Sequence, residues 1–231
     1  YRDTVDRAEA ALGAEYEKSE IYFVKTAKLN PGFSEAYMEL GHICALMDRW
    51  EESDFYFERA KMLTPKSSTL WNYLGLAAQL KGNDQEAEQD YTKAIIYAED
   101  NMSAYNNKAK LAYKLQKYQE AITDFNYITS HDSLFFEAFY NRGTIHLEME
   151  EYYPAIKDFS YILEKDSLFA DAWLNRSIAF YHLGKIDAAL SDAAKYIDSG
   201  GQLHPGYQEA LVEAWSSSIQ LKMPEKSNND R

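Results

Sequence analysis

The sequence has little cysteine, proline, glycine or positive charge, and each shortage excludes a class of protein. One cysteine in 231 residues excludes a disulfide framework within the chain. Five prolines and ten glycines argue against a disordered chain. Only 24 basic residues face 37 acidic ones, so a net charge of −13 disfavours nucleic acid and anionic membrane surfaces as partners.

Signals for membrane insertion and export are also missing. No apolar run approaches the ~18 residues of a membrane helix, and no charged-then-apolar segment opens the chain. We therefore expect a soluble protein without membrane insertion; the sequence leaves its compartment open and slightly favours the cytoplasm. Because the chain begins at Tyr1 without a methionine, a targeting segment removed from its N-terminal side stays compatible with the sequence.

Patterns that carry catalysis or bind metals are absent as well. The sequence has no GxSxG, no Walker loop and no GxGxxG. Its five histidines lie far apart, without HxxxH or Cys/His spacing. Cys44 lies among Ile43, Ala45 and Leu46, which indicates a small buried side chain rather than a reactive thiol. The sequence predicts no catalytic residue, no cofactor and no metal site.

What the sequence does contain is an internal repeat. One aromatic position recurs every thirty-four residues through the chain, as Tyr37, Trp71, Tyr105, Phe139, Trp173 and Tyr207. Between Phe136 and Phe169 the pattern is that of two amphipathic helices joined by a polar turn. There the ring of Phe159 is spaced to fill the notch left by Gly143 on the facing helix. A repeat of this period predicts an all-α solenoid.

The repeat resembles the tetratricopeptide repeat family. The residues that carry the resemblance are Tyr37, Leu40, Gly41, Trp50, Ser53, Phe57, Ala60 and Pro65. It covers almost the whole chain, and it implies a right-handed superhelix of antiparallel helix pairs that holds proteins or peptides. It does not name the partner.

The repeat divides the chain into one predicted array, residues 1–222. The predicted repeats are 1–33, which is degenerate and has an alanine-rich first helix, then 34–67, 68–101, 102–135, 136–169 and 170–203. A C-terminal cap helix is predicted at 205–222, and residues 223–231 read as a disordered tail.

Charged residues also follow the repeat. Lys108, Arg142 and Arg176 are each followed sixteen residues later by an aspartate, at Asp124, Asp158 and Asp192, and Asp90 is the equivalent residue one repeat earlier. We interpret them as a structural ladder of ion pairs rather than a ligand site.

The resemblance further implies a concave groove lined by the first helix of each repeat. In the 34–67 repeat the groove positions are Glu35, Met38, Glu39 and His42. The predicted peptide-binding residues come from the later repeats: Asn72, Tyr73, Asn106, Asn107, Lys110, Tyr113, Tyr140, Asn141, Thr144, Asn175, Ile178, Tyr181 and His182.

Among them, Asn107, Asn141 and Asn175 form a row at one repeat position. An asparagine amide offers donors and an acceptor, which match the N–H and C=O groups of an extended peptide. The row has two interpretations: the amides contact a peptide, or they only bond neighbouring repeats. Tyrosines beside them would add amphipathic contact area.

The partner is expected to be another protein or peptide, neutral or basic rather than acidic. Some family members clamp the acidic C-termini of chaperones with basic side chains, but here Glu137 and Asp171 occupy such positions, so this is not a chaperone carboxylate clamp. The expected function is a non-catalytic module that binds an extended segment in the groove. Two alternatives are a scaffold or spacer that contacts partners by its edges or convex face, and an accessory region of an enzyme whose catalytic domain lies elsewhere.

Overall fold

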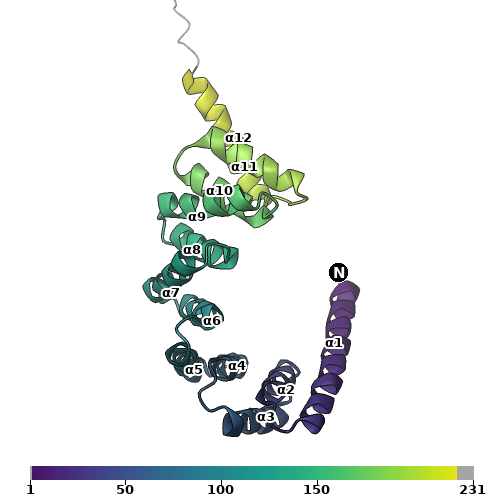
Figure 1. The fold of residues 1–231 in the computed structure, drawn as a ribbon. Coiled ribbons are helices and arrows are strands. Elements are labelled where there is room, and N and C mark those ends of the chain that lie inside the picture. The colour runs from purple at the N-terminus through teal and green to yellow at the C-terminus, as the bar shows by residue number, and fades with distance from the viewer. Residues whose placement is uncertain (1, 223–231) are drawn as a thin grey trace, which may run out of the picture. The chain divides into compact units, whose positions relative to one another are not determined.

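A computed structural model describes the backbone of residues 2–222 and the side chains of residues 12–217. These residues form twelve α-helices and no strand, so the predicted all-α helical-repeat class is confirmed (Figure 1). The contacts group the chain into two compact units, Tyr1–Asp124 and Phe125–Arg231, with the boundary inside α7 (Tyr118–His131). The single array therefore stays a prediction, and the predicted tail lies outside the described residues.

The first unit contains a long helix and two complete helix pairs. Its helices before α7 are α1 (Arg2–Leu29), α2 (Ser34–Leu46), α3 (Trp50–Leu63), α4 (Ser68–Leu80), α5 (Asp84–Tyr97) and α6 (Met102–Lys114). The first helix of each pair, here called an A-helix, contacts the next A-helix, so α2 packs on α4 and α4 on α6. The second helices α3 and α5 lie on the other side of this row (Figure 1).

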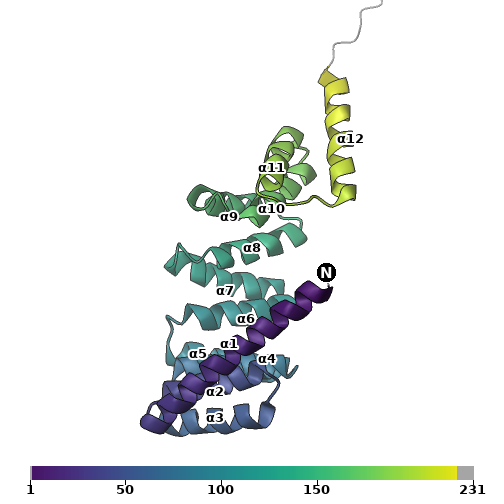
Figure 2. The same ribbon diagram turned by 90° about the vertical axis from the view of Figure 1, so that its right-hand side faces the viewer.

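The second unit repeats the arrangement. After the end of α7 come α8 (Phe136–Glu148), α9 (Tyr152–Lys165), α10 (Ala170–His182), α11 (Ile186–Asp198) and α12 (Pro205–Lys222). Its A-helices, α8 and α10, contact each other, and each also packs against the second helix of its own pair. The last helix, α12, covers α11 through Leu211, which is 2% exposed and packs with Ala189 and Ala193 (Figure 2).

The first repeat differs from the sequence prediction. The repeat pattern predicts a helix pair within residues 1–33, but α1 is one continuous helix over Arg2–Leu29 (Figure 2). No proline or polar turn interrupts this stretch, and alanine, glutamate and lysine favour helix, so Gly13 alone does not end it. Phe23, Val24 and Ala27, near its C-terminal end, pack against Ala36 and Leu40 of α2.

The turn inside each repeat has the same backbone geometry. The second residue after the end of each A-helix lies in the left-handed region, at Asp48, Gly82, Gln116, Glu150 and Gly184, one in each successive repeat. The next amide donates to the carbonyl five residues earlier, as from Arg49 to Cys44 and from Lys185 to Phe180. This is the Schellman ending of a helix, in which glycine is favoured. Three of the five turns use a residue other than glycine.

The core of each repeat is an aromatic ring against a small residue. Phe57, Tyr91 and Phe159 are at most 2% exposed, and each ring contacts the glycine sixteen residues before it, Gly41, Gly75 and Gly143. The predicted notch between Phe159 and Gly143 is confirmed. Such close packing fixes how the two helices of a repeat cross.

The predicted ladder of ion pairs is also confirmed, and every pair lies within one repeat. Lys108 Nζ lies 2.8 Å from Asp124 Oδ2, Arg142 Nε 2.8 Å from Asp158 Oδ2, and Arg176 Nε 2.7 Å from Asp192 Oδ2. All three aspartates are buried. Asp90 instead pairs with Lys93 on its own helix. Burial raises the pKa of Asp124, and the nearby Lys108 offsets only part of this rise.

None of the helices in residues 2–222 combines the length and apolar character that crossing a bilayer requires.

Candidate functional site

The A-helices of the first unit bring two predicted residues together. Asn107 on α6 donates from Nδ2 to Oδ1 of Asn72 on α4, over 3.0 Å. Asn72 is buried and Asn107 is half-buried. This bond joins neighbouring repeats, as the second interpretation of the asparagine row expects. It uses one N–H of an amide that offers two donors and an acceptor, so the capacity of Asn107 is not exhausted.

The second unit has a corresponding contact. Asn175 Nδ2 on α10 lies 3.2 Å from the hydroxyl oxygen of Tyr140 and 3.5 Å from Oγ1 of Thr144, both on α8. Thr144 itself donates to the backbone carbonyl of Tyr140 over 2.9 Å. Burial raises the pKa of Tyr140, with a smaller contribution from the charge of Asp171. Three predicted residues thus form one cluster around the Tyr140 hydroxyl.

Asn141, the middle member of the row, differs from the other two. Its Nδ2 is buried and has no hydrogen-bond partner among the described residues. Two other buried atoms also lack a partner among the described residues: Oδ1 of Asn106 and Nδ1 of His42. The Asn106 residue as a whole is 6% exposed. A buried polar atom without a partner costs free energy, so each is a point at which a further hydrogen bond would stabilise the protein.

The other predicted residues lie on the same helices. Lys110 on α6 is exposed, and Tyr113 on α6 and Ile178 on α10 are half-buried. Tyr181 packs edge-on against Tyr207, with ring centroids 5.7 Å apart, and His182 stacks on Tyr152 at 5.0 Å. These tyrosine and histidine contacts link α10 to α12 and α9, so part of the predicted groove surface is engaged within the unit.

One cluster joins the predicted residue Tyr73 to Glu39 and His42, two groove positions outside the predicted peptide-binding set. Glu39 and His42 on α2 meet Tyr73 on α4: the Tyr73 hydroxyl donates to Glu39 Oε1 over 2.9 Å, and the Tyr73 ring stacks on the imidazole at 4.6 Å. Burial and this hydrogen bond raise the pKa of Tyr73 to about 12. Burial lowers the pKa of His42. Glu39 and Tyr73 occupy the same position in successive repeats. This spacing is the feature of the sequence that could have predicted their contact.

A second cluster combines Glu20, Cys44 and Glu52, whose side-chain ligand atoms lie within 4.8 Å of one another. The guanidinium of Arg49 already pairs with both carboxylates of this cluster. It donates to both oxygens of Glu20, over 2.7 and 2.9 Å, and to Glu52. Burial raises the pKa of the Cys44 thiol to about 11. The cluster is an ion-pair network with a buried, protonated thiol beside it.

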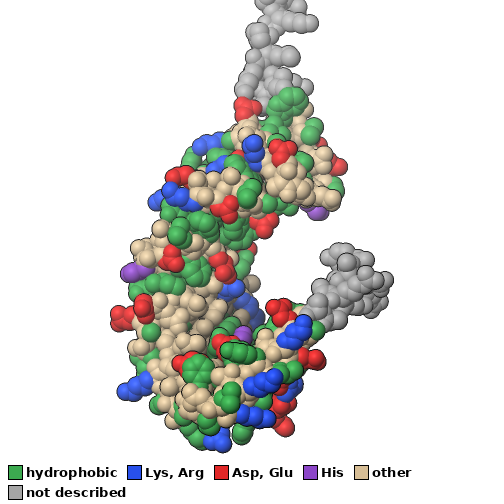
Figure 3. All heavy atoms as spheres, turned by 45° about the vertical axis from the view of Figure 1, so that its right-hand side comes forward, with side chains coloured by type: hydrophobic (Ala, Val, Ile, Leu, Met, Phe, Trp, Pro, Cys, Tyr) green, Lys and Arg blue, Asp and Glu red, His purple; other side chains and the backbone are tan. Residues whose placement is uncertain are grey.

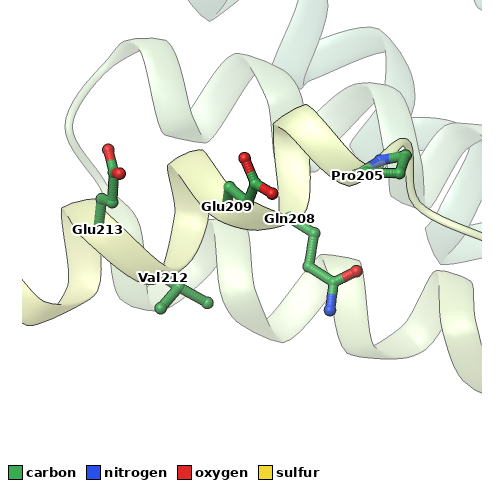
Figure 4. Close-up of a pocket in the computed structure, with 5 residues that line it drawn as sticks. All are labelled: Pro205, Gln208, Glu209, Val212 and Glu213. Atoms are coloured by element: carbon green, nitrogen blue, oxygen red, sulfur yellow. The ribbon is translucent and has the colours of Figure 1, made fainter.

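Two hollows on the described surface are lined by residues outside the predicted set. One of about 450 Å³ lies along α12, where Glu209 and Glu213 point to one side of the helix and Gln208 and Val212 to the other (Figure 4). Another, of about 420 Å³, lies beside Arg142 and Lys157. On the face that Figure 3 shows, acidic and basic side chains are interspersed.

Comparison with known proteins identifies the repeat. Two sequence models of the tetratricopeptide repeat match the chain, one over residues 85–131 and 140–205 and the other over residues 34–67, and together they cover more than half of it. No match is found among curated proteins.

Solved structures share the fold at low identity. The pilF protein of Pseudomonas aeruginosa is 22% identical, with 82% of this chain and 90% of that chain covered and a TM-score of 0.66. YrrB, described as a TPR protein with an unusual peptide-binding site, is 18% identical, with 84% and 97% covered and a TM-score of 0.63. MamA is 17% identical, with 72% and 91% covered and a TM-score of 0.63. By its repeat pattern, its helix pairs and these matches, the chain belongs to the tetratricopeptide repeat family.

Proposed function

We propose that this chain is a non-catalytic protein-interaction module that binds an extended segment of a partner protein on its A-helix side chains. The observation that carries the proposal is the asparagine row. Asn107 and Asn175 are half-buried amides held in place by neighbouring A-helices, and Asn141 has a buried donor with no partner among the described residues. An asparagine amide offers donors and an acceptor, which suit the main chain of an extended peptide.

The charge of the chain supports a neutral or basic segment. The net charge is −13, and Glu39, Glu137 and Asp171 lie on A-helices. An acidic segment would meet like charges there, whereas a basic one would be attracted over several ångströms. YrrB, a structural neighbour, is described as having a peptide-binding site, which agrees with this use of the fold.

The test uses an unbiased library of displayed peptides selected on the wild-type chain. Selected peptides are then measured against a variant with Asn107, Asn141 and Asn175 all changed to alanine. A matched control changes three exposed amides on the second helices, Gln85, Gln89 and Gln119, to alanine. We expect the first variant to bind about tenfold or more weakly, because several hydrogen bonds of about 1 kcal/mol each are lost, and the control to bind as the wild type does.

A scaffold role is the second candidate, and exposed apolar side chains away from the A-helices favour it. Phe55 and Met62 on α3 are 57% and 73% exposed, and Leu168, between α9 and α10, is 85% exposed. A scaffold would use side chains of this kind for contacts made by its edges or by the second helices. Peptides or partners that bind the alanine variant and the wild type equally would favour this role over the proposed one.

A further inference from the structure

The carboxylate of Glu39 is an exception among the described side chains. The other carboxylates of residues 12–217 that are buried or half-buried are Glu20, Asp84, Glu88, Asp90, Asp124, Asp132, Asp158, Asp166 and Asp192. All but Asp132 and Asp166 pair with a lysine or arginine, and these two each accept a backbone N–H of their own loop. Glu39 has neither kind of partner.

The one hydrogen bond that Glu39 accepts comes from a neutral group. The Tyr73 hydroxyl donates to Oε1, which fixes the carboxylate at the edge of the tyrosine ring. The neighbouring His42 imidazole stacks on the same ring, with 2° between the planes. Burial keeps this imidazole in its neutral form at pH 7. No positive charge within the cluster therefore balances Glu39.

We propose that Glu39, Tyr73 and His42 form a subsite for an arginine side chain of the bound protein segment. A guanidinium is planar, so it can donate two parallel hydrogen bonds to a carboxylate and lie against an aromatic ring. Glu39 supplies the carboxylate with one oxygen already oriented, and the stacked rings of Tyr73 and His42 supply the aromatic surface. The inference rests on the proposed function only in that the arginine belongs to a partner segment.

Arginine fits the cluster better than lysine does. A lysine ammonium is a compact, strongly hydrated charge that makes one hydrogen bond to a carboxylate oxygen and has no plane to lie against a ring. The flat ring pair and the fixed carboxylate both select for a planar donor. Binding should therefore fall in the order arginine, lysine, citrulline, the last of which keeps the shape of arginine but has no charge.

The direct test titrates the tripeptide acetyl-Gly-Arg-Gly-amide into the full chain and follows the ring proton signals of His42 and Tyr73 by NMR. We expect saturable shifts with the arginine peptide, about tenfold weaker binding with the citrulline peptide, and loss of the shifts in Glu39→Gln. Tyr73→Phe keeps the ring but removes the hydroxyl that orients Glu39, so its affinity should be intermediate. Glu51→Gln, an exposed carboxylate on α3, is the matched control and should bind as the wild type does.

The tripeptide titration and the peptide-library experiment test different proposals, and either can fail without the other. Equal shifts with the arginine and citrulline peptides, or unchanged shifts in Glu39→Gln, would overturn the arginine subsite while leaving the asparagine row untouched. If no library peptide depends on the asparagine row, the proposed function fails, and a positive tripeptide titration would still establish the subsite. In peptides that do depend on the row, replacing arginine by citrulline should weaken binding to the wild type about tenfold and hardly affect binding to Glu39→Gln.

Discussion

The ring of Phe159 on α9 occupies the space that a side chain at Gly143 on α8 would need. A Cβ atom at position 143 would lie 2.9 Å from Cε1 of this ring and 3.2 Å from Cβ of Asp158. Two repeats of the first unit are packed more tightly still, since a Cβ at Gly41 or Gly75 would lie 2.6 Å from the facing ring. The facing aromatic, rather than backbone flexibility, is what requires glycine at these helical positions.

Replacing Gly143 by alanine should therefore destabilise the protein. The new methyl group overpacks a fully buried contact, which costs about 1–3 kcal/mol. Alanine gains at most about 1 kcal/mol of helix propensity over glycine, so the loss should prevail. Urea unfolding followed by circular dichroism measures the difference. The double change Gly143→Ala with Phe159→Leu should recover part of it, and a more stable Gly143→Ala variant would contradict the packing argument.

A second comparison separates the core from the A-helix surface. Phe159→Ala removes a ring that is fully buried and should cost about 3–5 kcal/mol. Asn141→Ala removes an amide whose Nδ2 has no partner among the described residues, so its cost should be about 1 kcal/mol or less. Thermal melts of the two variants check the order. The reverse order would mean that Phe159 is wrongly assigned to the core and Asn141 wrongly assigned to the binding face.

The parts of the fold that recur with the repeat could be predicted from the sequence. The contact of Phe159 with Gly143 and the pairing of Arg176 with Asp192 follow from spacing alone, because helix pairs repeat with fixed geometry. The continuous helix α1 could not be predicted in this way. It lies where the repeat pattern fades, and there helix propensity decides the structure instead of packing between helices.

The site was less predictable than the fold. Repeat position alone placed Asn107 and Asn175 on A-helices, but it does not say which atoms they bond. The stacking of His42 on Tyr73 depends on side-chain orientation across two helices, and a sequence pattern carries no information on ring planes. The repeat places Glu39 at a groove position, but its lack of a lysine or arginine partner is visible only in three dimensions.

The repeated turn offers a route to greater stability. Gln116 has φ of 59° at the Schellman position, where Gly82 and Gly184 stand in other repeats. A residue with a Cβ loses free energy in this conformation, so Gln116→Gly should stabilise the protein by about 0.5–1 kcal/mol. The converse change, Gly82→Ala, should destabilise it by a similar amount. Differential scanning calorimetry measures both, and a lower Tm for Gln116→Gly would contradict the expectation.

The buried ion pairs should respond asymmetrically to substitution. Arg176→Met leaves the carboxylate of Asp192, whose side chain is 6% exposed, without its cation, and this should cost about 3–5 kcal/mol. Changing both residues, to Met and Leu, should cost less than the single change because no buried charge remains. Lys61→Met breaks the exposed pair with Glu58 and should cost under about 1 kcal/mol. Equal losses for Arg176→Met and Lys61→Met would show that the buried pair is solvated.

The stability of the first unit should depend on pH through His42. Burial disfavours the imidazolium and lowers the pKa of His42 below 6.5, while the charge of Glu39 opposes part of this shift. The unfolded chain then takes up the proton first as the pH falls. The contribution of His42 to the free energy of unfolding is therefore complete above pH 6.5 and declines as the pH falls below that value.

Two variants test this dependence. His42→Phe keeps a ring against Tyr73 but cannot titrate, so it should lose less stability than the wild type between pH 8 and pH 5.5. Glu39→Gln removes the charge that opposes the shift, so it should lose more. Urea unfolding at the two pH values gives the three differences. Parallel losses in all three proteins would place the pH dependence in other groups, and the imidazole would then have to be accessible enough to charge while stacked on Tyr73.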